Sequence, residues 1–305
     1  MTTGPRRALR AAITALVIPL AGCSSSYPTH SVATVLNVVT TTTQVSDLTR
    51  VVGGERIRVT QILKANIDPH DYEPTPADTK AIGDAKVIVI NGVGLETWLQ
   101  PLIDASGTKV RPTDTSAGVP LRTSGSTPGP DPHIWQDVRN AKTMVASIVS
   151  ALSAAMPSAA TTFHSNGDSY QADLDTLDGE LGNMYRTLTN NKIVTNHDAF
   201  GYLIDEYGLT FVGAVIPSFD SQSEASGKAL TALVAAVKAE GVKAIFAESS
   251  LPAKAADALA HDAGVKVVEG EDSLYGDTLG PVGSDGDTYL KMMRHNARVI
   301  VENLR

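Results

Sequence analysis

The feature that most constrains the fold is an alternation of short apolar strands with helical patterns, which occurs twice in the chain. In the first occurrence, strand patterns over 32–39, 57–63 and 87–90 flank a helix over 75–85 that is entered through a proline. Successive strand, helix and strand units form parallel sheets covered by helices. This part of the chain is therefore predicted to be an α/β lobe.

The stretch 138–188 separates the two occurrences and carries little strand signal. Apolar side chains recur there at three- and four-residue spacings: Met144, Ile148, Leu152, Tyr170, Leu174, Leu177, Leu181, Met184 and Leu188. Such spacing is typical of a helix with one buried face. We predict that a long helix crosses the molecule here, and we assign it to 153–188.

The alternation resumes after residue 188. The predicted strands cover 193–194, 209–216, 244–246 and 265–268, and the predicted helices cover 199–207, 227–240, 252–263 and 289–304. The resulting fold class is α/β, with an N-terminal lobe over 34–152, the linking helix over 153–188 and a C-terminal lobe over 189–305. In open α/β sheets ligands bind beyond the carboxyl ends of the strands, so the cleft between the lobes is the expected site.

Composition narrows the class further. Hydrophobic residues make up 42% of the 305 residues but aromatic residues only 5%, so the core must be mainly aliphatic, as in sheets flanked by helices. The net charge of −8 argues against a nucleic-acid partner.

The amino terminus is typical of an exported protein. Arg6, Arg7 and Arg10 precede an apolar run over 11–21 that is too short to span a bilayer permanently, so 1–22 is predicted to be a signal peptide. The run closes with Leu-Ala-Gly-Cys23, which resembles the lipobox at which bacteria acylate the cysteine. We expect a lipidated Cys23, the only cysteine in the chain, followed by a polar tether up to residue 33.

Common enzyme signatures are absent from the sequence. There is no His-Glu-x-x-His, no Gly-x-Ser-x-Gly and no phosphate-binding loop. The glycine-rich turn over 91–97 lacks the third glycine of a dinucleotide-binding fingerprint and is interpreted as a strand-to-helix connection.

Three of the seven histidines share a context, because each stands among proline, aspartate or asparagine near a strand or loop. They occur in Asp68-Pro69-His70, Asp131-Pro132-His133 and Asn196-His197-Asp198. A single histidine in such a place is more often a capping or hydrogen-bonding residue than a metal ligand. Three in similar positions favour a metal site.

These motifs carry a family resemblance. They are extended by Tyr72-Glu73-Pro74-Thr75-Pro76, Ile134-Trp135, Ala199-Phe200-Gly201-Tyr202 and Leu274-Tyr275-Gly276-Asp277-Thr278-Leu279-Gly280. From about residue 34 to its end, the chain resembles the metal-binding solute-binding lipoproteins of bacterial zinc and manganese ABC importers, the cluster A-I or cluster 9 family. The resemblance implies two rigid lobes joined by a long helix. It also implies that His70, His133, His197 and Asp277 hold a metal ion between the lobes.

Three imidazoles and one carboxylate suit a divalent ion of borderline softness, and zinc is the first choice for such a set. Manganese-preferring members of the family often carry a carboxylate in place of the third histidine, so His197 favours zinc. Some members with three histidines and an aspartate take either ion, and manganese therefore stays open as the alternative. Glu248 follows the predicted strand over 244–246, where by the resemblance a carboxylate commonly faces the site. It is a candidate for contacting one of the metal ligands, with a solvated loop carboxylate as the alternative.

The expected function is that of a non-enzymatic lipoprotein that captures the ion outside the cytoplasmic membrane. We expect it to be a monomer, anchored to the outer face of the cytoplasmic membrane or periplasmic, which delivers the ion to an ABC permease and its ATPase. A zinc hydrolase with Asp277 or Glu248 as general base would need an open coordination position. A surface adhesin is the third reading, although the sequence has no repeat or adhesive motif in its support.

Overall fold

The computed structural model describes residues 1–4, 35–124 and 127–305. Cys23, the tether and nearly all of the predicted signal peptide therefore lie outside the described residues. The chain from Thr34 to Arg305 forms one compact unit. Within the described ranges, no helix is both long and apolar enough to cross a membrane.

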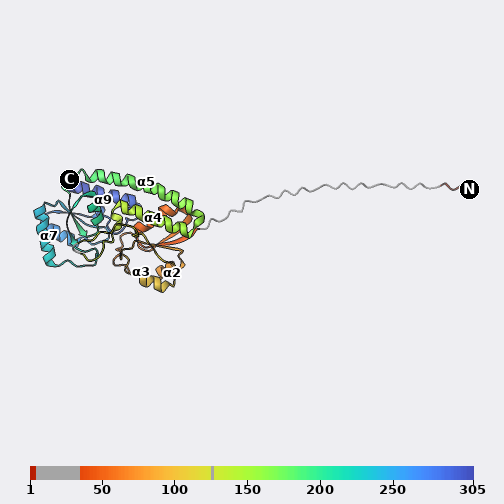
Figure 1. The fold of residues 1–305 in the computed structure, drawn as a ribbon, viewed down its shortest axis with the longest axis horizontal. Coiled ribbons are helices and arrows are strands. Elements are labelled where there is room, and N and C mark those ends of the chain that lie inside the picture. The colour runs from red at the N-terminus through yellow and green to blue at the C-terminus, as the bar shows by residue number, and fades with distance from the viewer. Residues whose placement is uncertain (5–34, 125–126) are drawn as a thin grey trace. The chain divides into compact units, whose positions relative to one another are not determined.

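The first sheet is parallel and contains four strands in the order β2-β1-β3-β4. Its strands are β1 (Leu36–Thr40), β2 (Ile57–Gln61), β3 (Val87–Ile90) and β4 (Thr113–Asp114). The helices that connect them are α1 (Thr43–Gly53), α2 (Pro76–Asp84) and α3 (Leu99–Ser106), which surround the sheet as shown in Figure 1.

The second sheet repeats this arrangement with the order β6-β5-β7-β8, again parallel. Its strands are β5 (Lys192–His197), β6 (Thr210–Ile216), β7 (Ala244–Phe246) and β8 (Lys266–Val268). The helices of this half are α6 (Gly201–Tyr207), α7 (Gly227–Glu240), α8 (Lys254–Ala263) and the C-terminal α9 (Tyr289–Leu304). The predicted α/β class, with two helix-flanked parallel sheets, is confirmed.

The strand order places a ligand-binding position in each sheet. In both sheets the first strand lies between the second and the third. The chain therefore adds its second strand on one side of the first strand and its third strand on the other side. A crevice opens at the carboxyl ends of the strands at such a reversal. In the second sheet that position is the end of β5 and β7, where His197 and the segment after Phe246 lie.

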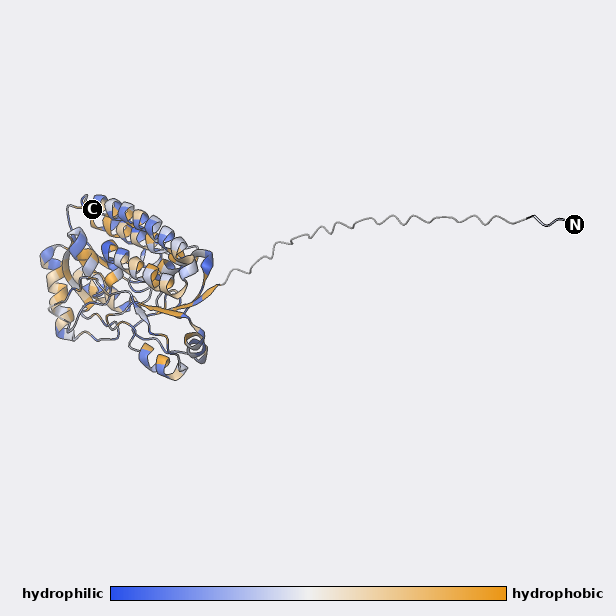
Figure 2. Ribbon diagram, turned by 45° about the vertical axis from the view of Figure 1, so that its right-hand side comes forward, coloured by the Kyte–Doolittle hydropathy of each residue, from blue (hydrophilic) through white to orange (hydrophobic). Residues whose placement is uncertain are grey.

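Alternate residues of each strand pack on opposite faces of its sheet, as the two-residue period of a strand requires. Val38 joins the large core cluster shared by both halves, whereas its neighbour Val39 packs in a smaller cluster under α2 and α3. Ile193 and Val194 divide in the same way in the second sheet. Figure 2 shows the strands toward the hydrophobic end of the scale and the helices with both kinds of residue. Both faces of each sheet are therefore covered.

Two helices fill the stretch between the sheets. α4 (Val138–Ala155) is followed by Met156, whose backbone leaves the helical region (φ −138°, ψ 76°). Pro157 then opens a short 3-10 turn before α5 (Ala160–Tyr185). The helix assigned from the sequence to 153–188 thus begins later and ends earlier. α5 packs against α1 from the first half and α9 from the second, and so links the two (Figure 1). The lobe boundaries themselves remain a prediction.

Three elements lie where the sequence predicted none: α1, α3 and β4. α1 is rich in valine and threonine, which have low helix propensity, but the Thr42 side chain caps it by accepting a hydrogen bond from Val45 N. Its residues Val45, Leu48 and Val52 are fully buried in the shared core. Tertiary packing therefore overrides local propensity in α1.

Candidate metal site

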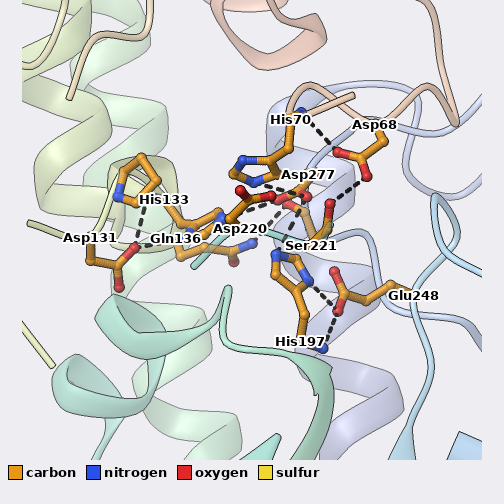
Figure 3. Close-up of polar contacts among 12 residues, drawn as sticks. Asp68, His70, Asp131, His133, Gln136, His197, Asp220, Ser221, Glu248 and Asp277 are labelled. Atoms are coloured by element: carbon orange, nitrogen blue, oxygen red, sulfur yellow. Dashed lines mark hydrogen bonds and ion pairs between the residues drawn. The ribbon is translucent and has the colours of Figure 1, made fainter. Parts of the chain in front are cut away.

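The structure brings together the four predicted ligands from four separate segments. His70 lies in the loop after β2, His133 precedes the 3-10 turn Ile134–Gln136, His197 ends β5, and Asp277 lies between β8 and α9. One ligand atom from each of them lies within 4.8 Å of the other three. Figure 3 shows the three rings directed toward the Asp277 carboxylate. The geometry can hold a metal ion.

The Asp277 carboxylate is the centre of the group. Its Oδ1 lies 3.3 Å from His133 Nε2, and its Oδ2 lies 3.5 Å from His197 Nε2 and 3.7 Å from His70 Nε2. Among the described residues, none of the three Nε2 atoms and neither carboxylate oxygen has a hydrogen-bond partner. Buried polar atoms are almost always paired, so five unpaired ones around a common centre form a place where a cation could bind.

Glu248 lies against the outer nitrogen of His197. Its Oε1 is 2.8 Å from His197 Nδ1 and also accepts a hydrogen bond from His197 N at 3.0 Å. Glu248 is only 2% exposed, which excludes the solvated-carboxylate alternative. A carboxylate at this position accepts a hydrogen bond from Nδ1–H, so that Nε2 is the ring nitrogen that can bind a metal ion.

Asp131 does for His133 what Glu248 does for His197, and the sequence reasoning did not assign it this role. Its Oδ1 lies 2.7 Å from His133 Nδ1 and accepts from His133 N at 3.0 Å. Its Oδ2 accepts from Arg122 Nη1 at 2.7 Å. The Asp-Pro-His spacing was the available signal, since a carboxylate two residues before a histidine can reach both its backbone N–H and its ring.

Asp68 stands at the same spacing before His70 but acts differently. Its Oδ1 accepts a hydrogen bond from His70 N at 2.8 Å. Its Oδ2 accepts from Ser221 Oγ at 2.5 Å and from Gln222 Nε2 at 3.2 Å, in the loop after β6 (Figure 3). The same motif therefore fastens the His70 loop to the second half of the molecule.

The surrounding carboxylates change the proton affinity of two rings. Burial lowers the pKa of His133, but the hydrogen bond and charge of Asp131, together with the charge of Asp277, outweigh burial and raise the pKa to about 10. Burial likewise opposes protonation of His197, and the charges of Glu248 and Asp277 raise its pKa to about 9. Without a metal, both rings are therefore in the positively charged, doubly protonated form at neutral pH.

His70 and Asp277 shift the other way. Burial, together with repulsion from the rings of His133 and His197, lowers the pKa of His70 despite the attraction of Asp277. Burial would raise the pKa of Asp277, but the three rings lower it well below its ordinary value. The carboxylate is therefore ionised and the site offers a negative oxygen pair.

Comparison with known proteins places the chain in a family. Residues 38–303 match the family model described as zinc-uptake complex component A, periplasmic. The chain belongs to this family. The manganese-binding lipoprotein MntA of Halalkalibacterium halodurans is 33% identical over 275 residues, which cover 88% of each chain. The iron ABC transporter substrate-binding lipoprotein MtsA of Streptococcus pyogenes is 28% identical, covering 94% of this chain and 95% of the relative.

A solved relative shares the fold. The periplasmic zinc-binding protein TroA of Treponema pallidum superposes with a TM-score of 0.83 at 28% identity, covering 88% of this chain and 99% of TroA. The names of these three relatives mention manganese, iron and zinc. Family membership alone therefore leaves the ion open.

Proposed function

We propose that this chain is the extracytoplasmic substrate-binding lipoprotein of an ABC importer and that it captures zinc. His70, His133, His197 and Asp277 are the proposed ligands, and the ion is the cargo. Cys23 is the proposed lipid anchor, and a permease with its ATPase is the proposed recipient. We further propose that the chain acts as a monomer.

The convergence of unpaired buried atoms carries this proposal. Three Nε2 atoms and the Asp277 carboxylate oxygens face one another without a hydrogen-bond partner among the described residues. A divalent cation at their centre would pair the three nitrogens and at least one of the carboxylate oxygens. Because four protein groups would fill a tetrahedral shell, the arrangement supports capture and release of an ion rather than hydrolysis, which uses an open position.

The chemistry of the ligands supports zinc over manganese. Three imidazoles are good ligands for zinc, whereas manganese favours oxygen and accepts more ligands. The manganese-binding lipoprotein at 33% identity supports the alternative that this chain takes manganese or both ions.

A competition experiment tests the function and the ion together. The metal-free chain from Ser24 to Arg305 is dialysed against equal free zinc and manganese, and bound ions are counted by elemental analysis. We expect one zinc per chain and little manganese. Bound manganese in the presence of zinc would contradict the zinc assignment, and binding of neither ion would contradict the proposed function.

We expect zinc affinity to keep rising with pH well above the ordinary histidine range. The ring pKa values of His133 and His197 in the metal-free site are about 10 and about 9, and each ring must lose its inward proton before it binds zinc. Acid therefore opposes binding, and the affinity falls up to about tenfold per pH unit for each proton displaced. A site built from unperturbed histidines would level off above about pH 7.5.

Calorimetry in buffers of different ionisation enthalpy measures this proton release directly. Release at about pH 8 is the expected result, because an unperturbed imidazole is already neutral there. Zinc binding without proton release at that pH would contradict the assigned electrostatics.

Replacing Glu248 with glutamine is expected to weaken zinc binding about 10-fold to 100-fold. The amide keeps the shape of the side chain but loses the charge that holds the proton on His197 Nδ1. Chelator competition measures the affinity. Glu269→Gln, on an exposed glutamate in the same half of the molecule, is the matched control. Equal affinities for the two variants would remove Glu248 from the site.

A further inference from the structure

The backbone carbonyl of Gly276, one residue before Asp277, is held by two side chains from the other half of the molecule. Trp135 Nε1 and Gln136 Nε2 each donate a hydrogen bond to it at 3.0 Å. Both residues are fully buried and stand two and three positions after His133 in the chain. One backbone oxygen thus connects the His133 segment to the Asp277 segment.

Other contacts hold Trp135 in place, and burial encloses the Gln136 side chain. The Trp135 carbonyl accepts a hydrogen bond from Tyr289 Oη at 2.7 Å, and the Trp135 ring meets the His133 ring edge to face at 5.4 Å. Gln136 Oε1 has no hydrogen-bond partner in the part of the chain that the structure describes. A buried amide with an unpaired oxygen is costly, so the bond made by its Nε2 must compensate.

Gly276 is also confined on its other side. A Cβ at this position would lie 1.9 Å from Glu248 Oε2, so any other residue would displace the Glu248 carboxylate. Glu248 in turn holds the ring of His197. The Gly276 peptide therefore lies between the group that orients His197 and the segment that carries His133.

The residues after Asp277 are anchored to the first half as well. Thr278 Oγ1 accepts a hydrogen bond from Asn66 N at 3.0 Å, and Leu279 N donates to Thr43 Oγ1 at 2.7 Å. The Asp277 carboxylate itself accepts no hydrogen bond from any residue that the structure describes. Its orientation toward the three rings thus depends on the anchored backbone on either side.

That orientation decides how many oxygens the site can offer an ion. Asp277 Oδ1 faces His133 and Oδ2 faces His197 and His70, so one oxygen or both could bind. With one oxygen the shell has four ligands, as zinc favours, and with two it has five, which suits manganese better.

We propose that Gln136, together with Trp135, is a positioning residue that determines the metal preference of the site. By holding the Gly276 carbonyl, it restrains the orientation of Asp277, and with it whether one carboxylate oxygen or both reach the ion. This inference rests on the proposed function, since it concerns the same site.

The test compares Gln136→Leu and Trp135→Phe with the unmodified chain. Each variant removes one donor to the Gly276 carbonyl. Gln136→Leu puts an apolar side chain of similar size in its place, and Trp135→Phe leaves a smaller aromatic ring. We expect zinc affinity to fall about 10-fold to 100-fold. We expect manganese affinity to change less, so that the zinc-to-manganese preference narrows. The strong ligand-field absorption of tetrahedral cobalt, used as a spectroscopic substitute, should weaken as the coordination number rises.

Gln171→Leu is the matched control, because Gln171 Nε2 also donates to a backbone carbonyl, that of Lys142, between α5 and α4. Variants whose zinc-to-manganese preference and cobalt spectrum equal those of this control would overturn the inference while leaving the proposed function intact. An unmodified chain that binds neither ion would overturn both. If Gln136→Leu does not fold, Trp135→Phe decides alone, because it removes the indole N–H donor and keeps an aromatic ring.

Discussion

Replacing His197 with alanine is expected to lower the zinc affinity of the chain by more than about 100-fold. Residues that only orient a metal ligand cost about 10-fold to 100-fold when removed, and loss of a proposed ligand should exceed that range. His197 is fully buried at the end of β5, so no exposed side chain can replace its nitrogen. Chelator competition with a zinc-responsive dye measures the affinity.

The control for this variant is His164→Ala. His164 lies exposed on α5, outside the four-residue group, so its removal changes the histidine count without touching the site. Near-native zinc affinity in His197→Ala would show that the ion binds elsewhere. Equal losses in both variants would point to a nonspecific effect of histidine removal.

Zinc is expected to raise the stability of the fold strongly. At about 1,000 times its dissociation constant, a ligand that binds only the folded state adds about 4 kcal/mol to the free energy of unfolding. For a chain of this size, that corresponds to a rise of about 8 °C in the thermal midpoint. The ligands come from both halves of the molecule, so the ion would bridge segments that separate on unfolding.

Thermal unfolding with and without zinc measures the shift, and His197→Ala supplies the reference. The variant should show a much smaller rise at the same zinc concentration, because its dissociation constant is higher. An unchanged midpoint for the unmodified chain in excess zinc would contradict the presence of a preformed site. A rise of equal size in the variant would place the stabilising ion outside the four-residue group.

Much of the fold could be predicted from periodicity. The strands over 57–61, 87–90 and 244–246 and the helices over 227–240 and 289–304 lie where apolar spacing placed them, within about two residues. α1 could not be predicted, because its valines and threonines have a local preference for strands. The buried face that it shares with α5 makes it helical, and that face exists only in the assembled core.

Part of the metal site could also be predicted from the sequence. Histidines set among proline and aspartate in three similar contexts indicated a metal site, and the structure brings these histidines together with Asp277. The carboxylates that contact the outer ring nitrogens were harder to predict from the sequence. Glu248 lies 51 residues beyond His197 in sequence but 2.8 Å from its ring, a contact that only the adjacency of β5 and β7 creates.

The sequence by itself determined the α/β class and the residues that converge, because strand periodicity and local motifs are encoded within short segments. Only the tertiary structure decided that Asp131 and Glu248 contact the Nδ1 atoms of His133 and His197. Asp68 instead fastens the His70 loop. The tertiary structure alone showed that Trp135 and Gln136 hold the backbone beside Asp277. The physical reason is that hydrogen bonds between distant segments depend on the packing of the two sheets, which no local pattern specifies.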